Sequence, residues 1–160
     1  MTIQKTKPTY KDLTKIMFTS GNPKLDKNLK DEDLKKYWIK RLNLAPASIN
    51  ACLHEAGNPV FMPQKTLGRV NRTQLYFKDR AKFLSMITRE IRNHEILCKK
   101  YDLKPVIRLN TTSDIMWENH KIFDLFPNVQ FYDYTKHFKR MIKYLKGDMP
   151  KNYHLTFSRN

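Results

Sequence analysis

Apolar and polar positions follow a helical period through the middle of the chain. Between residues 69 and 101 the apolar side chains recur every three or four positions, at Phe83, Leu84, Ile87, Ile91 and Cys98. This spacing is typical of a helix with one buried side. Asp79 is suited to cap the main helix, and we therefore expect a separate, earlier helical stretch at 69–77.

Three later segments have the character of buried strands. The first, from Pro105 to Asn110, is an apolar run broken only by Arg108, and the others lie at 129–136 and 153–158. Apolar runs of this length are typical of parallel strands that are covered on both faces. Helical patterns at 115–126 and 138–145 separate the three strands.

Helices that alternate with strands at these spacings predict an α/β fold built from parallel βα units. The sheet is expected to be either a partial (β/α) barrel-like sheet or a small open parallel sheet with flanking helices. Right-handed crossovers would then bring the carboxyl ends of the three strands to one edge.

The N-terminal part of the chain has a weaker pattern. In chain order it predicts a strand at 15–19, a helix at 32–42 capped by Asp31 or Asp33, a strand or connector at 42–47, a short helix at 49–56 and a loop at 57–68. For a chain of 160 residues, 40% of them apolar, we expect one folded domain at 21–160 preceded by a lead-in at 1–20.

Short polar side chains follow each predicted strand, where ligands of parallel α/β sheets bind. They are Asn110, Thr112, Ser113 and Asp114 after the first strand, Tyr134 and Lys136 at the second, and Ser158 at the third. A catalytic role is predicted for Asp114 as a general base, for Lys136 as an anion ligand, base or nucleophile, and for Ser113 beside them. The alternative is that Ser113 or Asp114 only caps the following helix.

Arg69 and Arg72 would share one side of a helix, because they are three residues apart. Two guanidinium groups in this arrangement can clamp a phosphate, and the alternative is a solvated helix face. Together with Asn110, Thr112, Tyr134 and Ser158 they complete the predicted ligand-binding set.

The net charge is +16, from 31 Lys and Arg against 15 Asp and Glu. Such a charge attracts polyanions, so a nucleic acid or a nucleotide is an expected partner. The basic residues are dispersed along the chain, however, which also fits a basic protein without a dedicated binding surface.

Cysteine usage and hydropathy exclude several other classes of protein. Cys52 and Cys98 are too few for a disulfide framework, and Cys52 with His54 lacks the further ligands that a metal needs, so we expect no metal site and a cytoplasmic location. No apolar run approaches membrane-spanning length, and the N-terminus has no signal-peptide pattern. The sequence also contains no phosphate-binding loop or dinucleotide fingerprint.

Seven ordered blocks of the sequence resemble the gene-product-eighty-eight family of bacteriophage proteins. The blocks are GNPKL at 21–25, NLAP at 43–46, ACLHEAG at 51–57, GRVNRT at 68–73, VIRLNTTSDI at 106–115, FYDYTK at 131–136 and NYHLTFS at 152–158. The resemblance implies a phage or prophage protein of unassigned activity, acting in the host cytoplasm. It also implies a barrel-like α/β fold with additional cysteines before the block of Cys52, as in an iron–sulphur or radical-chemistry loop.

This chain lacks those cysteines, and a single thiolate at Cys52 does not hold an iron–sulphur cluster. The resemblance therefore implies a shortened member, either with a partial barrel or with a partner subunit that covers its edge strand. Three functions follow as hypotheses, with the cofactor left unassigned. The first is binding of a phosphate-bearing ligand, nucleotide or nucleic acid; the others are a degenerate relative of an iron–sulphur or radical-type enzyme, and a small host-takeover protein that acts by binding a host or phage protein.

Overall fold

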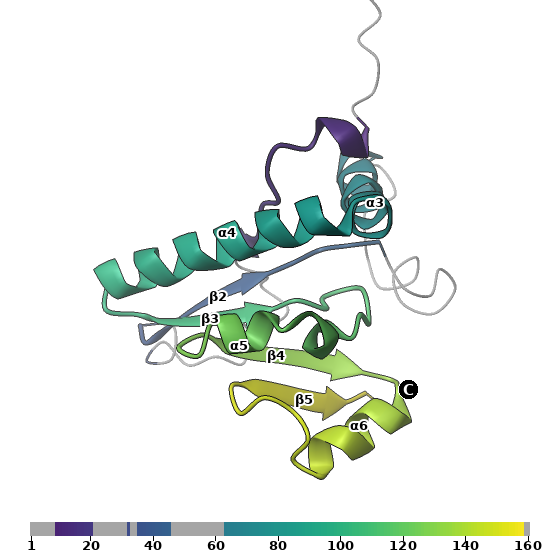
Figure 1. Cartoon of the computed structure of the whole chain (residues 1–160). Coiled ribbons are helices and arrows are strands. Elements are labelled where there is room, and N and C mark those ends of the chain that lie inside the picture. The colour runs from purple at the N-terminus through teal and green to yellow at the C-terminus, as the bar shows by residue number, and fades with distance from the viewer. Residues whose placement is uncertain (1–8, 21–31, 33–34, 46–62, 159–160) are drawn as a thin grey trace, which may run out of the picture.

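The fold is a five-stranded sheet with helices packed on one face (Figure 1). The computed structural model describes residues 9–20, 32, 35–45 and 63–158. The strands are β1 (Thr19–Ser20), β2 (Tyr37–Arg41), β3 (Lys104–Arg108), β4 (Gln130–Thr135) and β5 (Tyr153–Phe157). The helices are α3 (Pro63–Lys78), α4 (Arg80–Lys100), α5 (Ile122–Leu125) and α6 (Phe138–Leu145), with 3-10 turns η1 (Tyr10–Asp12) and η2 (Trp117–His120).

The strand order along the sheet is the same as the order along the chain. β2 to β5 pair in parallel, and β1 is antiparallel at one edge. With right-handed crossovers, a sequential order places the crossover helices on the same face. The structure thus confirms the predicted parallel α/β fold in its small open form.

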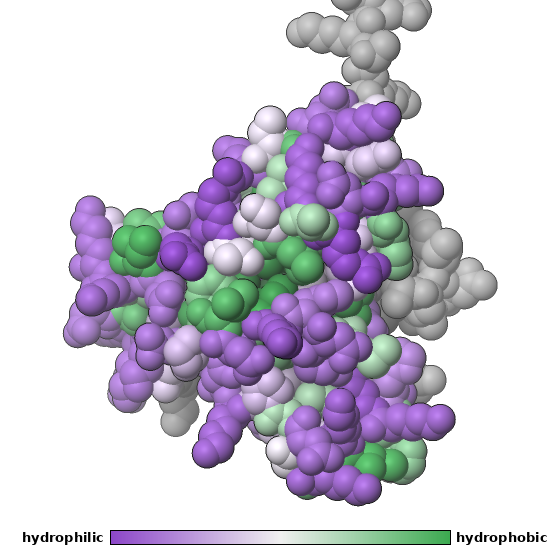
Figure 2. Space-filling model, viewed as in Figure 1, coloured by the Kyte–Doolittle hydropathy of each residue, from purple (hydrophilic) through white to green (hydrophobic). Residues whose placement is uncertain are grey.

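One continuous hydrophobic core fills the space between the helices and the sheet. Phe83, Ile87 and Ile91 of α4 belong to the same buried cluster as Ile107 of β3 and Phe131 of β4. These side chains are fully buried, so each contributes about 1.5–3 kcal/mol of hydrophobic free energy relative to exposure. The view in Figure 2 shows a mostly hydrophilic surface, with apolar surface gathered between α4 and α5.

The predicted break between two helices at Asp79 is confirmed. The Asp79 carboxylate accepts a hydrogen bond of 3.1 Å from Lys82 N and so caps α4. α4 then runs to Lys100, close to the predicted end at 101.

The predicted helix at 32–42 is wrong over its second half, which forms β2. Tyr37, Trp38 and Ile39 are aromatic or β-branched, and they pair in parallel with β3 through Tyr37↔Lys104 and the following residues. Sheet pairing with a distant segment outweighs the local spacing of apolar residues.

Three other boundaries also differ from the expectation. α3 begins at Pro63, within the predicted loop at 57–68. Proline suits the first position of a helix, because the backbone N–H that it lacks would have no partner in the first turn. Lys121, at φ 55°, splits the predicted helix at 115–126 into η2 and α5. The strand expected at 15–19 is limited to Thr19–Ser20. Residues 42–45 form a connector, which is one of the two alternatives predicted for 42–47.

The short helix predicted at 49–56 lies outside the described residues, as does Cys52. No helix among those described combines the length and apolar content needed to cross a membrane.

Candidate functional site at the carboxyl edge of the sheet

Asn110, directly after β3, organises the carboxyl edge through its side chain. Its Oδ1 accepts hydrogen bonds from Ser113 Oγ at 3.0 Å, Ile115 N at 2.9 Å and Trp117 Nε1 at 2.9 Å. Its Nδ2 donates to Ile115 O at 2.8 Å and to Asp133 Oδ2 at 3.3 Å. The amide is buried and fully engaged, so it fixes the 110–117 turn over the end of the sheet.

Asp133 of β4 lies beneath this turn and is buried. Asn110 N donates to its Oδ1 at 2.7 Å, and the hydroxyl of Tyr153 donates to its Oδ2 at 3.3 Å. Burial raises the pKa of Asp133 to about 7, although the hydrogen bond from Asn110 N acts in the opposite direction. A proton therefore binds this carboxyl group near neutral pH.

Asp114 connects the same turn to the start of α6. Its carboxylate accepts hydrogen bonds from Thr135 Oγ1 at 2.9 Å, Lys136 N at 3.1 Å and Arg140 Nη1 at 2.8 Å. Asp114 therefore does not cap the next helix along the chain, which was the predicted alternative to a catalytic role. It instead satisfies a backbone N–H just before α6.

Arg140 is the cationic centre of this network, with 4% of its surface exposed. It donates to both oxygens of Glu118, at 2.9 and 2.7 Å, and to the hydroxyl of Tyr153 at 2.7 Å. With Asp114, it thus forms ion pairs with two carboxylates and ties η2, α6 and β5 together.

On the other side of the edge, the connector after β2 is held by α3 and by β3. Arg72 Nε donates to Asn43 O at 2.8 Å, and Ala45 N donates to Thr73 Oγ1 at 2.8 Å. Leu42 N donates to Arg108 O at 2.9 Å, and the Thr112 hydroxyl donates to Leu44 O. Arg72 and Thr112 therefore contact the same short connector, one from each side.

The charges of Arg69 and Arg72 are not neutralised by a described carboxylate. Burial lowers the pKa of Arg72, and the nearby charge of Arg69 lowers it further. Within the described ranges, the salt bridges join Asp114 or Glu118 to Arg140, or Asp114 to His137. Among the described residues, the α3 end of the edge therefore carries two cations without a carboxylate partner.

Arg108 lies on the sheet face opposite the helices, on the same face as its register partner Arg41. Its guanidinium carbon is 4.6 Å from the ring centroid of Tyr134, and its Nε donates to Asn110 O at 3.2 Å. The Tyr134 ring is 42% exposed, so it offers an accessible aromatic surface beside a cation.

The sequence-predicted residues thus come together at one edge, but with different surroundings. Asn110, Ser113 and Asp114 are engaged in hydrogen bonds within the chain, whereas Arg69 and Arg72 lie on the α3 side. Ser158 N donates to Thr135 O at 2.9 Å, which keeps the end of β5 beside the end of β4. Their catalytic and binding roles stay predictions.

Sequence reasoning missed Arg140, Glu118 and Tyr153. A single basic residue in the lysine-rich 136–146 segment carries no signal that it is the buried one, and Glu118 is 22 positions away. Arg108, by contrast, interrupts the apolar run at 105–110, and this interruption indicated a charged residue within the sheet.

No group of three or more His, Cys, Asp or Glu in the described part of the chain is arranged to hold a metal ion. His54, like Cys52, lies outside the described residues.

Comparison with models of protein families identifies a family for this chain. The family model described as gene product 88 matches residues 17–160. Searches of the curated proteins and of the solved structures found no match.

Proposed function

The chain belongs to the gene product 88 family, and we propose that it binds a nucleic acid or another phosphate-bearing ligand at the carboxyl edge of the sheet. The phosphate would lie against the α3 side of this edge, at Arg69 and Arg72. The family match itself assigns no ligand.

The observation that supports the proposal most is the proximity of two guanidinium groups that lack a described carboxylate partner. Arg72 is half-buried, and the charge of Arg69 lowers its pKa. An anion relieves the repulsion between the two arginines, and a phosphate accepts hydrogen bonds from both guanidinium groups.

Three further features favour a polyanion over a small anion. The net charge of +16 provides a long-range attraction that steers a charged chain to the surface. Lys136, at the end of β4, has an exposed side chain on the same edge. The Arg108–Tyr134 pair adds a cation and an accessible ring at the carboxyl end of the sheet.

The predicted residues Asn110, Ser113 and Asp114 have a supporting role in this proposal. Their polar atoms hold the turn and the start of α6, so they would shape the edge on which the ligand lies. Thr112 would do the same by holding the connector next to Arg72.

The test is a fluorescence anisotropy titration of a labelled single-stranded oligonucleotide over a range of salt concentrations. The variant Arg69→Gln/Arg72→Gln should bind about tenfold or more weakly, and the slope of log K against log salt should become shallower by about 0.7 for each lost phosphate contact. The control is Arg92→Gln/Lys99→Gln, which removes the same charge from exposed positions of α4.

The control changes the net charge as much as the first variant does but removes no residue of the proposed site. It should therefore bind within about threefold of the wild type. Equal losses in the two variants would show that binding follows net charge and has no site at Arg69 and Arg72. Absence of binding by the wild type at low salt would overturn the proposal as a whole.

A further inference from the structure

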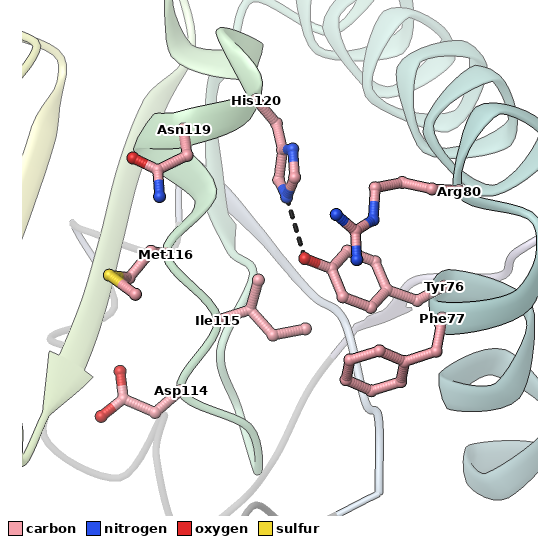
Figure 3. Close-up of a pocket in the computed structure, with 8 residues that line it drawn as sticks. All are labelled: Tyr76, Phe77, Arg80, Asp114, Ile115, Met116, Asn119 and His120. Carbon is pink, nitrogen blue, oxygen red and sulfur yellow. Dashed lines mark hydrogen bonds between the residues drawn. The ribbon is translucent and has the colours of Figure 1, made fainter.

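A cavity of about 520 Å³ lies between the α3–α4 junction and the segment that precedes α5 (Figure 3). Tyr76, Phe77 and Arg80 border it from the helical side, and Met116 and His120 from the other side, with Ile115 between them. Asp114 and Asn119 complete the lining, and the Asp114 carboxylate is paired with Arg140. The volume suits a planar heterocycle, since small-molecule sites start at roughly 300 Å³.

The polar groups of the cavity are held in place. Tyr76 OH and His120 Nε2 are 2.9 Å apart, and the Arg80 guanidinium carbon is 4.7 Å from the centroid of the Tyr76 ring. Burial lowers the pKa of His120, and the charge of Arg80 lowers it further, so the imidazole is neutral at physiological pH. The neutral imidazole of His120 can form hydrogen bonds with an uncharged ring of a ligand. The guanidinium group of Arg80 attracts an anion that is attached to such a ring.

The apolar groups are unusually exposed. Phe77 is 66% exposed and Met116 is 50% exposed, and they border the cavity from opposite sides. Exposed large apolar side chains at a cavity mouth are typical of a surface that covers an aromatic ligand.

The cavity also continues the basic surface of α3. Arg69, Arg72 and Tyr76 follow at spacings of three and four residues and so share one side of α3, and Arg80 stacks on Tyr76. A ligand chain with phosphates on Arg69 and Arg72 would therefore reach the cavity, with Arg80 available for the next phosphate.

We propose that this cavity takes an unstacked base of a single-stranded nucleic acid. The inference rests on the proposed function, because the phosphates on either side of the base would be held by the α3 arginines. A base within a duplex is stacked on its neighbours and cannot enter the cavity without being flipped out, which costs free energy. The protein should therefore prefer single strands to duplexes of the same length.

The experiment compares three labelled ligands by anisotropy: a single strand, its duplex, and the same single strand with abasic sugars. For the wild type, the single strand should bind roughly 5- to 150-fold more tightly than the abasic strand, as expected for loss of one base–aromatic stack. In Phe77→Ala and in Met116→Ala this preference should shrink, while the salt dependence of binding stays as in the wild type. Ile96→Ala, an exposed apolar residue of α4 away from the cavity, is the matched control and should keep the preference.

The outcomes separate the inference from the proposed function. Salt-dependent binding without a difference between normal and abasic strands, or with equal affinity for the duplex, would overturn the base site and leave phosphate binding intact. A preference that survives both substitutions would place the base elsewhere and also overturn the inference. Absence of binding by the wild type to all three ligands would overturn both.

Discussion

The two sides of the carboxyl edge use charge in different ways. Beside β4 and β5, the guanidinium group of Arg140 meets the carboxylates of Asp114 and Glu118 and the hydroxyl of Tyr153, all at hydrogen-bonding distance. Beside α3, Arg69 and Arg72 repel one another, and no described carboxylate offsets their charge. The first arrangement stabilises the fold, whereas the second favours binding of an anion from outside.

This difference also separates two kinds of candidate residue. A side chain whose hydrogen-bonding capacity is filled within the chain, such as Asn110, has little to offer a ligand unless the turn rearranges. A half-buried cation such as Arg72, whose Nε donates to a backbone carbonyl and which has no carboxylate partner among the described residues, is better suited to bind an anion. Predictions for the two sides therefore differ in whether stability or binding changes.

The largest expected effect is on stability, from Arg140→Met. The substitution leaves the Asp114 and Glu118 carboxylates without their cation, and breaking one partner of a buried ion pair costs about 3–5 kcal/mol. Urea unfolding measures the loss. Lys139→Met, at the exposed neighbouring position, should change the free energy of unfolding by no more than about 0.5 kcal/mol. A loss below about 1 kcal/mol in Arg140→Met would contradict a stabilising network.

Asp133→Asn should remove a pH dependence of the unfolding free energy. The pKa of Asp133 is about 7 in the folded chain, well above its ordinary value of 3.8, so the folded state binds the extra proton between these two values. Its contribution to stability is therefore present at low pH and declines as the pH rises from about 4 to 7, by about 1.4 kcal/mol per pH unit. The difference in stability, wild type minus Asp133→Asn, should fall across this window; a flat or rising difference would refute the raised pKa.

His94 should show the opposite pH dependence. Burial lowers its pKa to about 4, while its ring Nε2 lies 2.9 Å from Trp38 O. The unfolded chain binds a proton more readily between about pH 4 and 6.5, so the contribution of neutral His94 is lost as the pH falls. The difference in stability, wild type minus His94→Gln, should rise with pH in this window, and chemical denaturation at several pH values measures it. A difference that stays constant would mean that the imidazole is not held neutral.

Thr112→Val should have a smaller effect. The valine retains the shape of the side chain but leaves Leu44 O without the hydroxyl donor, which costs about 1 kcal/mol for a part-buried hydrogen bond. Thermal unfolding measures the change. Ser85→Ala, an exposed position on α4, serves as the control, and an equally small change in both variants would mean that the connector is not held by Thr112.

The smallest effect on stability is expected for Arg69→Gln. The substitution removes a like charge beside Arg72, and the Arg69 side chain forms no salt bridge with a described carboxylate. The unfolding free energy should change by no more than about 0.5 kcal/mol, in the stabilising direction. A decrease of about 1 kcal/mol or more in the free energy of unfolding would show that Arg69 stabilises the fold, which would contradict a role in ligand binding alone.

The sequence predicted the elements whose signals are local. The Asp79 cap separates α3 from α4 through a carboxylate and an N–H three residues apart. The strand β3 and the polar turn after it follow from an apolar run and the residues next to it. Alternation of helices and strands was enough to bring Asn110, Lys136 and Ser158 to one edge.

What the sequence did not predict depends on contacts between distant segments. β2 forms because Tyr37–Arg41 pairs with β3 across more than 60 positions, which its own Lys- and Asp-rich surroundings do not indicate. The cavity depends on Tyr76 meeting His120, 44 positions away. Likewise, only the packed fold distinguishes Arg140, which is buried, from the exposed basic residues around it.

The most direct test compares Asp114→Asn with Arg69→Gln/Arg72→Gln in one oligonucleotide titration, with the folded fraction of each variant measured by circular dichroism. If the two sides of the edge differ as described, the folded Asp114→Asn protein binds the single strand within about threefold of the wild type, because the Asp114 carboxylate is bonded within the chain to Thr135, Lys136 N and Arg140. The arginine variant then binds at least about tenfold more weakly with a shallower salt dependence. The reverse result, in which Asp114→Asn loses binding and the arginine variant keeps it, would contradict the account.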